Sequence, residues 1–329
     1  MINYDEFLNP TLVNVQPSGI RKFFAIAEEM KNVISLGVGE PDFLTPWHIR
    51  QAGIDNLAKG ATRYTANAGL AELREEISRY YARKFLVKYD PTDEILVTVG
   101  GSEGIDMAIR SIITPGDEVL VIEPSFVCYK PIIEVSGGKA IPLPTYQKDD
   151  FTLDPEVLKA AITPKTKALV FPYPNNPTGS IMTREQLKEI ADIVIDNNLF
   201  VISDEIYSEL TYIPEGHTTI ASIDGMQERT IVINGFSKSY SMTGWRLGYA
   251  LGPAPVIKQM TKLHQFAIMS APTTSQRAAV DALKNGDFDI SKMVSDYDMR
   301  RRFTVDAFNK IGLSCFEPKG AFYVFPCIK

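Results

Sequence analysis

The chain has few cysteines, no long apolar run and no concentration of positive charge. Its 329 residues include three cysteines, Cys128, Cys315 and Cys327, which are too few and too scattered to predict a disulfide framework or a metal site. No apolar run approaches the length of a membrane-spanning helix, and the first residues lack the pattern of a signal peptide. We therefore expect a cytoplasmic protein with no metal ion and no membrane partner.

The balance of charge argues against a nucleic-acid partner. Lysine and arginine total 34, aspartate and glutamate total 40, and the formal net charge is −6, with both signs interspersed along the chain. A nucleic-acid-binding domain typically carries a basic patch instead. Hydrophobic residues make up 45% of the chain and charged residues 22%, which is typical of a globular protein. The length allows one large domain and one smaller domain.

Short apolar runs alternate with helical patterns through the middle of the chain. Strands are expected over residues 95–99, 118–122, 168–171, 200–203 and 231–234. Most of these runs are continuous, which is typical of strands buried on both faces of a mainly parallel sheet. A capping box of Thr183 and Gln186 predicts the start of one helix, and the apolar residues between Ile105 and Ile112 predict another. The pattern indicates an α/β fold that binds ligands outside the carboxyl ends of its strands.

The segment after the last of these strands is the most informative part of the chain. Residues 234–249 read Asn-Gly-Phe-Ser-Lys-Ser-Tyr-Ser-Met-Thr-Gly-Trp-Arg-Leu-Gly-Tyr. Lys238 follows a buried strand, where loss of hydration lowers the pKa of an amine and frees it to attack a carbonyl. Arg246 offers a planar fork suited to a phosphate. A single lysine is more often a solvated surface charge, but an amine beside a phosphate clamp suits pyridoxal phosphate.

This segment resembles the Schiff-base motif of the class I/II aminotransferases of fold type I. The likeness is greatest to the bacterial aspartate, aromatic and N-acetyl-diaminopimelate aminotransferases. It implies that Lys238 holds pyridoxal 5'-phosphate as a Schiff base, and that Ser237 and Arg246 help to bind this cofactor. It also implies a mainly parallel sheet of seven strands between helices in a large cofactor-binding domain, residues 45–285. Residues 1–44 and 286–329 would form a smaller α+β domain.

Four other strand-end loops match the same family in the same order. The loop Gly-Gly-Ser-Glu-Gly at residues 100–104 resembles the loop that cups the cofactor phosphate, through backbone amides at a helix N-terminus. The resemblance assigns that cup to Gly101, Ser102 and Glu103. It further assigns the stacking ring to Phe126 and the donor to the ring hydroxyl to Asn176. It assigns the partner of the pyridine nitrogen to Asp204 and the donor to the ring oxygen to Tyr207.

The residues themselves leave simpler interpretations open for each loop. Phe126 could be a core residue rather than a stacking ring, and Asn176 could serve only the turn, where the X–Pro bonds are candidates for the cis form. Asp204 could cap a helix, but a carboxylate that ends a buried strand needs a partner, and a protonated pyridine nitrogen is a suitable one. If Asp204 points toward the ring, Glu205 is expected to point away from it.

Segments nearer the amino end extend the resemblance to about Gly19–Pro326. Residues 35–42 match the family's substrate segment, where Gly39 approaches the substrate carboxylate, and Asn176 is a second substrate contact in the family. Residues 63–74 match a segment whose tyrosine, Tyr64 here, reaches the cofactor phosphate of the neighbouring subunit. The resemblance therefore implies a homodimer with shared active sites.

The implied reaction is transamination between an aspartate-type or aromatic L-amino acid and a 2-oxo acid such as 2-oxoglutarate, with ping-pong kinetics. In the family, more sheet and helix follow the strand expected at residues 318–326, and they contain the arginine that binds the substrate carboxylate. No residue here matches that arginine, since Arg300, Arg301 and Arg302 are expected on the solvated face of a helix over residues 299–311. We therefore expect a truncated form with weak or no activity.

Two other functions remain open. The same fold, lysine and aspartate support β-elimination in C–S lyases, which release pyruvate and ammonia from cystathionine. Aminotransferase-like domains also serve as ligand-binding modules of transcription regulators. Those proteins carry a DNA-binding extension, whereas only about twenty residues precede the fold here and the net charge is acidic.

Overall fold

The computed structural model of the protein describes residues 2–17, 26, 30, 37 and 39–328. Residues 18–24, whose Ser-Gly-Ile-Arg-Lys-Phe-Phe pattern contributes to the likeness to the aspartate, aromatic and N-acetyl-diaminopimelate aminotransferases, lie outside the described residues. The same holds for Ser35, Leu36 and Val38 of the expected substrate segment.

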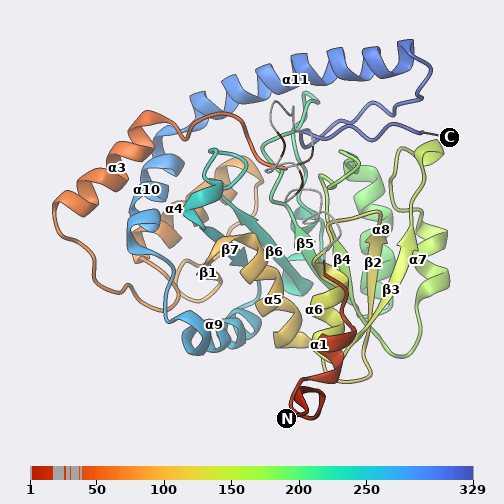
Figure 1. The fold of residues 1–329 in the computed structure, drawn as a ribbon, viewed down its shortest axis with the longest axis horizontal. Helices are drawn as coiled ribbons and strands as arrows, with labels where there is room; N and C mark the ends of the chain where they lie inside the picture. Colours follow the sequence, from red (N-terminus) through yellow and green to blue (C-terminus); the bar gives the residue numbers. More distant parts are fainter. Residues whose placement is uncertain (1, 18–25, 27–29, 31–36, 38, 329) are drawn as a thin grey trace.

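A seven-stranded sheet forms the centre of the described part of the chain (Figure 1). Its strands are β1 (Ile95–Thr98), β2 (Glu118–Glu123), β3 (Lys139–Pro144), β4 (Thr166–Phe171), β5 (Phe200–Asp204), β6 (Thr230–Gly235) and β7 (Gly248–Leu251). They lie in the order β1-β7-β6-β5-β4-β2-β3. Strand β7 is antiparallel to β1 and to β6, and the other neighbours are parallel. The predicted mainly parallel sheet is confirmed.

Two strands were not predicted, and one predicted strand is absent. β3 contains Pro142 and Pro144, which argue against a strand in a sequence, but it lies at the sheet edge, where proline is tolerated. β7 is only four residues long and begins with a glycine. The strand expected at residues 318–326 was wrong, because that segment makes only isolated bridges, at Gly320 and Pro326.

Helices cover both faces of the sheet. They are α1 (Pro10–Asn14), α3 (Trp47–Ala58), α4 (Ala71–Lys84), α5 (Gly100–Ile112), α6 (Tyr129–Val135), α7 (Pro155–Ala161), α8 (Arg184–Asp196), α9 (Ala254–Ile268), α10 (Thr273–Asn285) and α11 (Asp287–Lys310). Short 3-10 helices are η1 (Tyr4–Glu6), η2 (Gln147–Asp149), η3 (Ile220–Ser222), η4 (Gln227–Arg229) and η5 (Thr243–Trp245).

The two faces of the sheet bury different sets of side chains. Helices α5, α6 and α9 pack on one face, where β4 contributes Ala168 and Val170. Helices α7 and α8 pack on the opposite face against Leu169 and Phe171 of the same strand, and α4 and α10 cover that face near β1 and β7. Successive residues of a strand point to opposite faces, so a strand covered on both sides must be apolar throughout. This explains the continuous apolar runs in the sequence.

Helices α8 and α11 each test an expectation from the sequence, one about the first turn of α8 and one about Arg301 in α11. The capping box that begins α8 is confirmed, since the Thr183 amide donates to Gln186 Oε1 at 2.9 Å and the Gln186 amide donates to Thr183 Oγ1 at 3.3 Å. The expectation that Arg301 lies on a solvated face was wrong. Its side chain is only 9% exposed and pairs with Asp298 and Glu317, because α11 packs against the segment that follows it.

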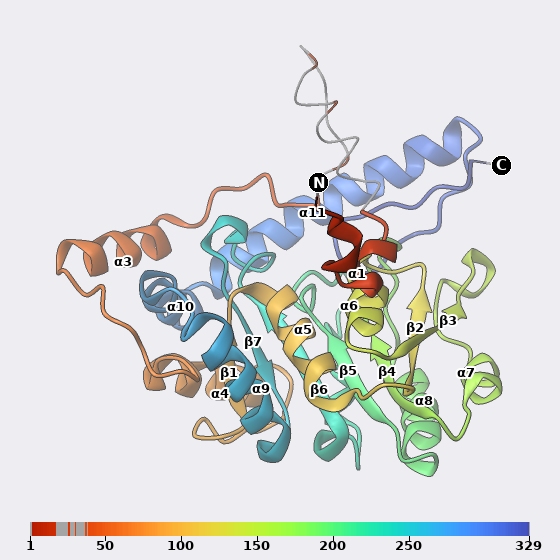
Figure 2. The ribbon, with the colours of Figure 1, turned by 60° about the horizontal axis from the view of Figure 1, so that its bottom comes forward.

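The carboxyl ends of the parallel strands and the amino end of antiparallel β7 meet at one edge of the sheet. Helix α11 passes across this edge (Figure 2), and Met293 and Tyr297 of α11 pack there against Tyr207 and Leu210. The C-terminal segment runs between α11 and the sheet (Figure 1), where Ala321 joins the same cluster. No helix among the described residues combines the length and the apolar character needed to cross a membrane.

Candidate functional site

A cavity of about 520 Å³ opens at this edge of the sheet. Its volume lies in the range of small-molecule sites. Most of the residues that the sequence predicted for the site line it, namely Gly39, Gly101, Ser102, Phe126, Asn176, Asp204, Tyr207, Ser237, Lys238 and Arg246. The structure thus brings the five strand-end loops together around one space. The side chain of Glu103 and the ring of Tyr64 are not part of this lining.

Lys238 projects into the cavity from the loop after β6. Its Nζ donates a hydrogen bond to the carbonyl oxygen of Gly39 and lies 5.8 Å from the ring centroid of Tyr207. The pKa of the amine is lowered to about 8, mainly by burial and also by the positive charge of Arg246, against the opposing charge of Glu40. A substantial fraction of the amine is therefore uncharged near pH 8 and can act as a nucleophile or a base.

Asp204 ends β5 at the floor of the cavity and is 7% exposed. Its Oδ2 accepts a hydrogen bond of 2.7 Å from the hydroxyl of Tyr129, and its Oδ1 accepts one of 3.2 Å from the amide of Ile206. Burial raises the pKa of Asp204, and the hydrogen bond from Tyr129 opposes this effect. The carboxylate therefore lies ready for a cationic partner that enters the cavity.

Sequence reasoning missed Tyr129. This residue begins α6 three positions after Phe126, and the two rings meet edge to face with centroids 6.1 Å apart. Phe126 itself is 37% exposed and lines the cavity, as a ring that is free to stack on a ligand must be. The only signal in the sequence was that the two aromatics are three residues apart; Phe126 lies in the loop before α6, so no helical pattern links it to Tyr129.

The part of the cavity beside Gly101, Ser102 and Arg246 is suited to an anion. Helix α5 begins there, and the free amides of a helix N-terminus favour negative charge. The Arg246 guanidinium packs so tightly on this turn that a Cβ at Gly100, where φ is +75°, would lie 2.6 Å from Nη2. Among the described residues, Arg246 has no carboxylate partner, and its Nη1 donates to the carbonyl of Thr243 at 2.9 Å. Its charge thus remains available to a ligand.

Glu103 turns its side chain away from this anion-binding end. One carboxylate oxygen accepts a hydrogen bond from the amide of Val99, and the other lies 2.9 Å from Nδ1 of His264. Any contribution of Glu103 to the phosphate cup is therefore restricted to its backbone, as the sequence reasoning expected.

Gly39 and Tyr323 form the cover of the cavity, and Tyr323 contacts Tyr207 of the floor. The hydroxyl oxygens of the two tyrosines are 2.6 Å apart, and burial raises the pKa of Tyr207 well above its usual range, although a hydrogen bond with Asn176 opposes this. A Cβ at Gly39 would come within 2.3 Å of the Tyr323 hydroxyl, so glycine is needed there. Sequence reasoning missed Tyr323, which lies in a segment expected to be a strand. The expected cis peptide bonds are present before Pro174 and Pro177.

Residues 31–329 match the family model described as aminotransferase class I and II. The chain belongs to this family. Three similar proteins show the degree of this similarity. YugH of Bacillus subtilis (strain 168) is 50% identical over 98% of this chain and 83% of its own length. The aspartate aminotransferase of Pyrococcus abyssi is 44% identical, over 96% of this chain and 82% of its own. The crystal structure of an aromatic aminotransferase from Pyrococcus horikoshii superimposes with a TM-score of 0.88 at 42% identity, covering 94% of this chain and 82% of that one.

Membership of the aminotransferases makes the protein an enzyme of fold type I that uses pyridoxal phosphate and acts on small molecules. The observed cavity fits that cofactor. An amine with a pKa of about 8 lies between a buried carboxylate, which suits a pyridinium nitrogen, and a cationic turn, which suits a phosphate. The ring of Phe126 can lie against the flat face of the cofactor.

In this aminotransferase Tyr64 stays outside the cavity of its own chain. The ring is 82% exposed, on the loop between α3 and α4. That loop is nevertheless anchored, since Thr273 Oγ1 donates to the carbonyl of Arg63 at 2.7 Å and Gln276 Nε2 donates to Thr65 Oγ1 at 3.1 Å. The assignment of Tyr64 to the site of a neighbouring subunit remains a prediction.

Proposed function

We propose that this aminotransferase transfers the amino group of an aspartate-type or aromatic L-amino acid to a 2-oxo acid such as 2-oxoglutarate, with ping-pong kinetics. The observation that carries the proposal is the amine of Lys238, with its pKa of about 8, between Asp204 and the turn held by Arg246. The choice of substrates is supported by the names of the aspartate and aromatic aminotransferases among its relatives.

Bound pyridoxal phosphate supplies a carbonyl carbon that takes up an amino group and a conjugated ring that withdraws electrons from it. Lys238 would hold the cofactor through a covalent bond from its Nζ. Its free amine would take the proton from the substrate α-carbon as a base and would return it, as an acid, to the cofactor carbon that receives the amino group. A pKa of about 8 suits both directions of this proton transfer near neutral pH.

The other residues orient the cofactor during this transfer. Asp204 would keep a proton on the pyridine nitrogen, because a buried carboxylate stabilises the positive charge of a ring nitrogen beside it. Tyr207 and Asn176 would donate to the ring oxygen, and Phe126 would stack on the ring. The phosphate is held by Gly101, Ser102, the backbone of Glu103, Ser237 and Arg246.

The substrate lies between two parts of the chain in this proposal. Residues 45–285 form the cofactor-binding domain, and residues 1–44 with 286–329 form the smaller domain. The lining of the cavity supports this division, because Gly39 and Tyr323 from the second part face the loops of the first. Gly39 and Asn176 approach the substrate carboxylate.

The proposal also includes a homodimer in which Tyr64 binds the cofactor phosphate of the partner subunit. The exposed ring on an anchored loop supports this role. Co-expression of Tyr64→Ala chains with Lys238→Ala chains tests it, because a mixed dimer has one site with both residues intact. Recovery of activity relative to either variant alone is expected. Mixed dimers that stay inactive would contradict the shared site.

A screen of amino donors and 2-oxo acid acceptors with the cofactor-loaded enzyme tests the reaction itself. Aspartate or an aromatic amino acid should be converted with 2-oxoglutarate, with parallel lines in double-reciprocal plots. Release of pyruvate and ammonia from cystathionine without amino transfer would instead identify a C–S lyase. Lys238→Ala is the control, and it should abolish both reactions and the visible absorbance band of the bound cofactor.

A further inference from the structure

A second buried carboxylate lies directly behind Asp204 and has no part in the reaction proposed above. Glu205 follows Asp204 in the chain, and its side chain is turned away from the cavity, as expected for consecutive residues at a strand end. It is 1% exposed, and its Oε1 accepts hydrogen bonds from Ser203 Oγ at 2.8 Å and from Thr219 Oγ1 at 2.6 Å. Two hydroxyl donors on one oxygen are suited to an ionised carboxylate.

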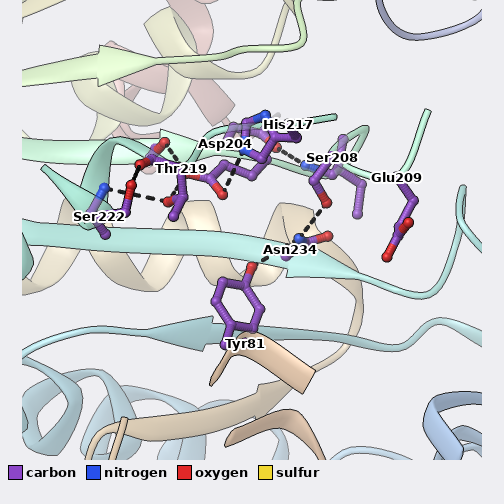
Figure 3. Close-up of polar contacts among 12 residues, drawn as sticks. Tyr81, Asp204, Ser208, Glu209, His217, Thr219, Ser222 and Asn234 are labelled. Atoms are coloured by element: carbon purple, nitrogen blue, oxygen red, sulfur yellow. Dashed lines mark hydrogen bonds and ion pairs between the residues drawn. The ribbon is translucent and has the colours of Figure 1, made fainter. Parts of the chain in front are cut away.

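The third group beside this carboxylate is a histidine. His217 Nε2 lies 3.0 Å from Glu205 Oε2, the two side chains are 7% and 1% exposed, and neither atom makes a hydrogen bond among the described residues, so the two form an ion-pair contact without hydrogen-bond geometry. His217 and Thr219 both come from the loop before η3, so this loop is tied to the end of β5 (Figure 3). A cavity of about 10 Å³, roughly the size of one water molecule, lies beside the pair.

The backbone of Glu205 connects the pair to the active site. Its amide donates to the carbonyl of Ile233 in β6 at 2.8 Å, and its carbonyl accepts from the amide of Ser208 at 2.9 Å. The turn that carries Asp204 and Tyr207 is therefore held from both sides. Asn234 Nδ2 donates to Ser208 Oγ and to the hydroxyl of Tyr81, both at 2.9 Å, which joins this turn to the strand that leads to the catalytic lysine (Figure 3).

Charge couples the two neighbouring carboxylates as well. Burial is the main cause that raises the pKa of Asp204, and the negative charge of Glu205 raises it further. An unpaired carboxylate at the position of Glu205 would therefore oppose the ionisation on which the proposed role of Asp204 depends. The imidazole at 3.0 Å offsets part of that charge when it is protonated.

We propose that Glu205 and His217 act as a positioning pair for the active site. Glu205 holds the turn that carries Asp204 and Tyr207, and His217 offsets its charge so that Asp204 stays ionised against the cofactor nitrogen. This inference rests on the proposed roles of Asp204 and Tyr207. It adds two residues that touch neither the cofactor nor the substrate.

Three variants separate charge from packing: His217→Leu, Glu205→Gln and the double variant Glu205→Gln/His217→Leu. In His217→Leu the buried charge is left unpaired, so kcat should fall by about tenfold, the change in acid dissociation that one pKa unit represents, with KM little changed. Glu205→Gln keeps an acceptor for Ser203 and Thr219 without a charge, and kcat should stay within about threefold of the parent enzyme. The double variant should recover to the level of Glu205→Gln.

Nitrogen NMR of the holoenzyme, with pyridoxal phosphate labelled at the pyridine nitrogen, gives a readout that packing alone would not move. The parent enzyme, Glu205→Gln and the double variant should show a protonated nitrogen, and His217→Leu a shift toward the unprotonated position. His48→Leu is a matched control, because His48 lies 36% exposed between Asp281 and Asp289. It should change neither the signal nor kcat.

A double variant no better than His217→Leu, in kcat and in the nitrogen signal, would overturn the proposal and leave a packing role. If His217→Leu does not fold, His217→Gln replaces it, because a neutral amide cannot offset the charge of Glu205; kcat should then fall in His217→Gln and recover in Glu205→Gln/His217→Gln. A parent enzyme whose pyridine nitrogen is unprotonated would contradict the role given to Asp204, and so the proposed function. The parent signal thus distinguishes failure of the function from failure of the pair.

Discussion

The floor and the cover of the active-site cavity are built in different ways. The floor consists of loops that follow directly from strands of the sheet, and it contains the buried Asp204 and the amine of Lys238. The cover consists of Gly39 and Tyr323, from segments near the two ends of the chain. The floor is held by a continuous hydrogen-bonded sheet, whereas the segment of Tyr323 is joined by isolated bridges.

The difference in construction matches two different requirements, keeping a buried group ionised and closing over a substrate. A group that must stay ionised in a buried place needs rigid surroundings, because any relaxation admits water and changes its pKa. A group that only closes over a substrate does not. We therefore expect substitutions in the floor to affect turnover and cofactor binding, and substitutions in the cover to affect mainly KM.

Replacement of Lys238 by alanine is the most severe test of the floor. Turnover should fall by more than about a thousandfold, because the variant lacks both the covalent anchor and the base. Steady-state transamination and the visible band of the cofactor provide the measurement. Lys284→Ala is the matched control, since this lysine is 42% exposed and pairs with Glu72 at the surface. A comparable loss of turnover in both variants would contradict the proposed role of Lys238 as covalent anchor and base.

Asp204→Asn should have the next largest effect. The amide has a similar shape but no charge to keep the pyridine nitrogen protonated, so kcat should fall by about a hundredfold, as when one preorganised electrostatic group is lost. Asp106→Asn on α5, a surface residue paired with Arg110, is the control. A variant with normal kcat would show that the buried carboxylate is structural only.

Arg246→Ala should weaken cofactor binding rather than the chemical steps. Loss of a charged hydrogen-bonding partner costs about 1.5–3 kcal/mol, so the dissociation constant for pyridoxal phosphate should rise by about ten- to a hundredfold. Titration of the cofactor-free protein by absorbance measures this. Saturating cofactor should restore much of the turnover. If turnover stays low at saturation, the arginine has a further role in the reaction.

Burial of Lys238 in the floor should also lower the stability of the folded, cofactor-free protein at neutral pH, an effect that has no counterpart in the cover. The pKa of Lys238 is about 8 in the fold, against 10.5 for an ordinary lysine, so the unfolded chain binds more protons between these values. The cofactor-free protein should become more stable as pH rises from about 8 to 10.5. Lys238→Met should be more stable than the parent at pH 7 by about 2 kcal/mol, reduced from the full value by partial access of water.

Urea unfolding of both cofactor-free proteins at several pH values measures this difference. It should remain constant below pH 8 and disappear above pH 10.5, where the lysine is uncharged in both states. A difference that does not depend on pH would indicate a packing effect of methionine instead.

Tyr323→Phe tests the cover and should have the smallest effect. The ring remains in place, but the hydroxyl contact with Tyr207 is lost, which costs about 0.5–1.5 kcal/mol. We expect kcat/KM to fall by about two- to tenfold, mostly through KM, with cofactor affinity unchanged. Tyr146→Phe, at a 54% exposed residue, is the control. A fall in kcat larger than the rise in KM would show that Tyr323 affects turnover in the way expected of floor residues.

Predictions from sequence succeeded where the position of a residue follows directly from chain order. Asp204 and Lys238 come at the ends of apolar runs, so the strand-end rule was sufficient to place them at one edge of the sheet. Tyr129 and Tyr323 were missed because each acts on a residue far away in the chain. The hydrogen bonds in question span 75 and 116 positions, to Asp204 and Tyr207.

The sequence by itself determined the family, the alternation of strands and helices, and the order of the loops around the cofactor. Apolar runs buried on both faces leave few alternatives to such a sheet. The tertiary structure decided which charges stand alone and which are paired. The antiparallel β7 brings Arg246 onto the turn of Gly100, and the loop of His217 reaches the carboxylate behind Asp204. Burial and charge pairing depend on such distant contacts, and these in turn set the pKa of Lys238 and of Asp204.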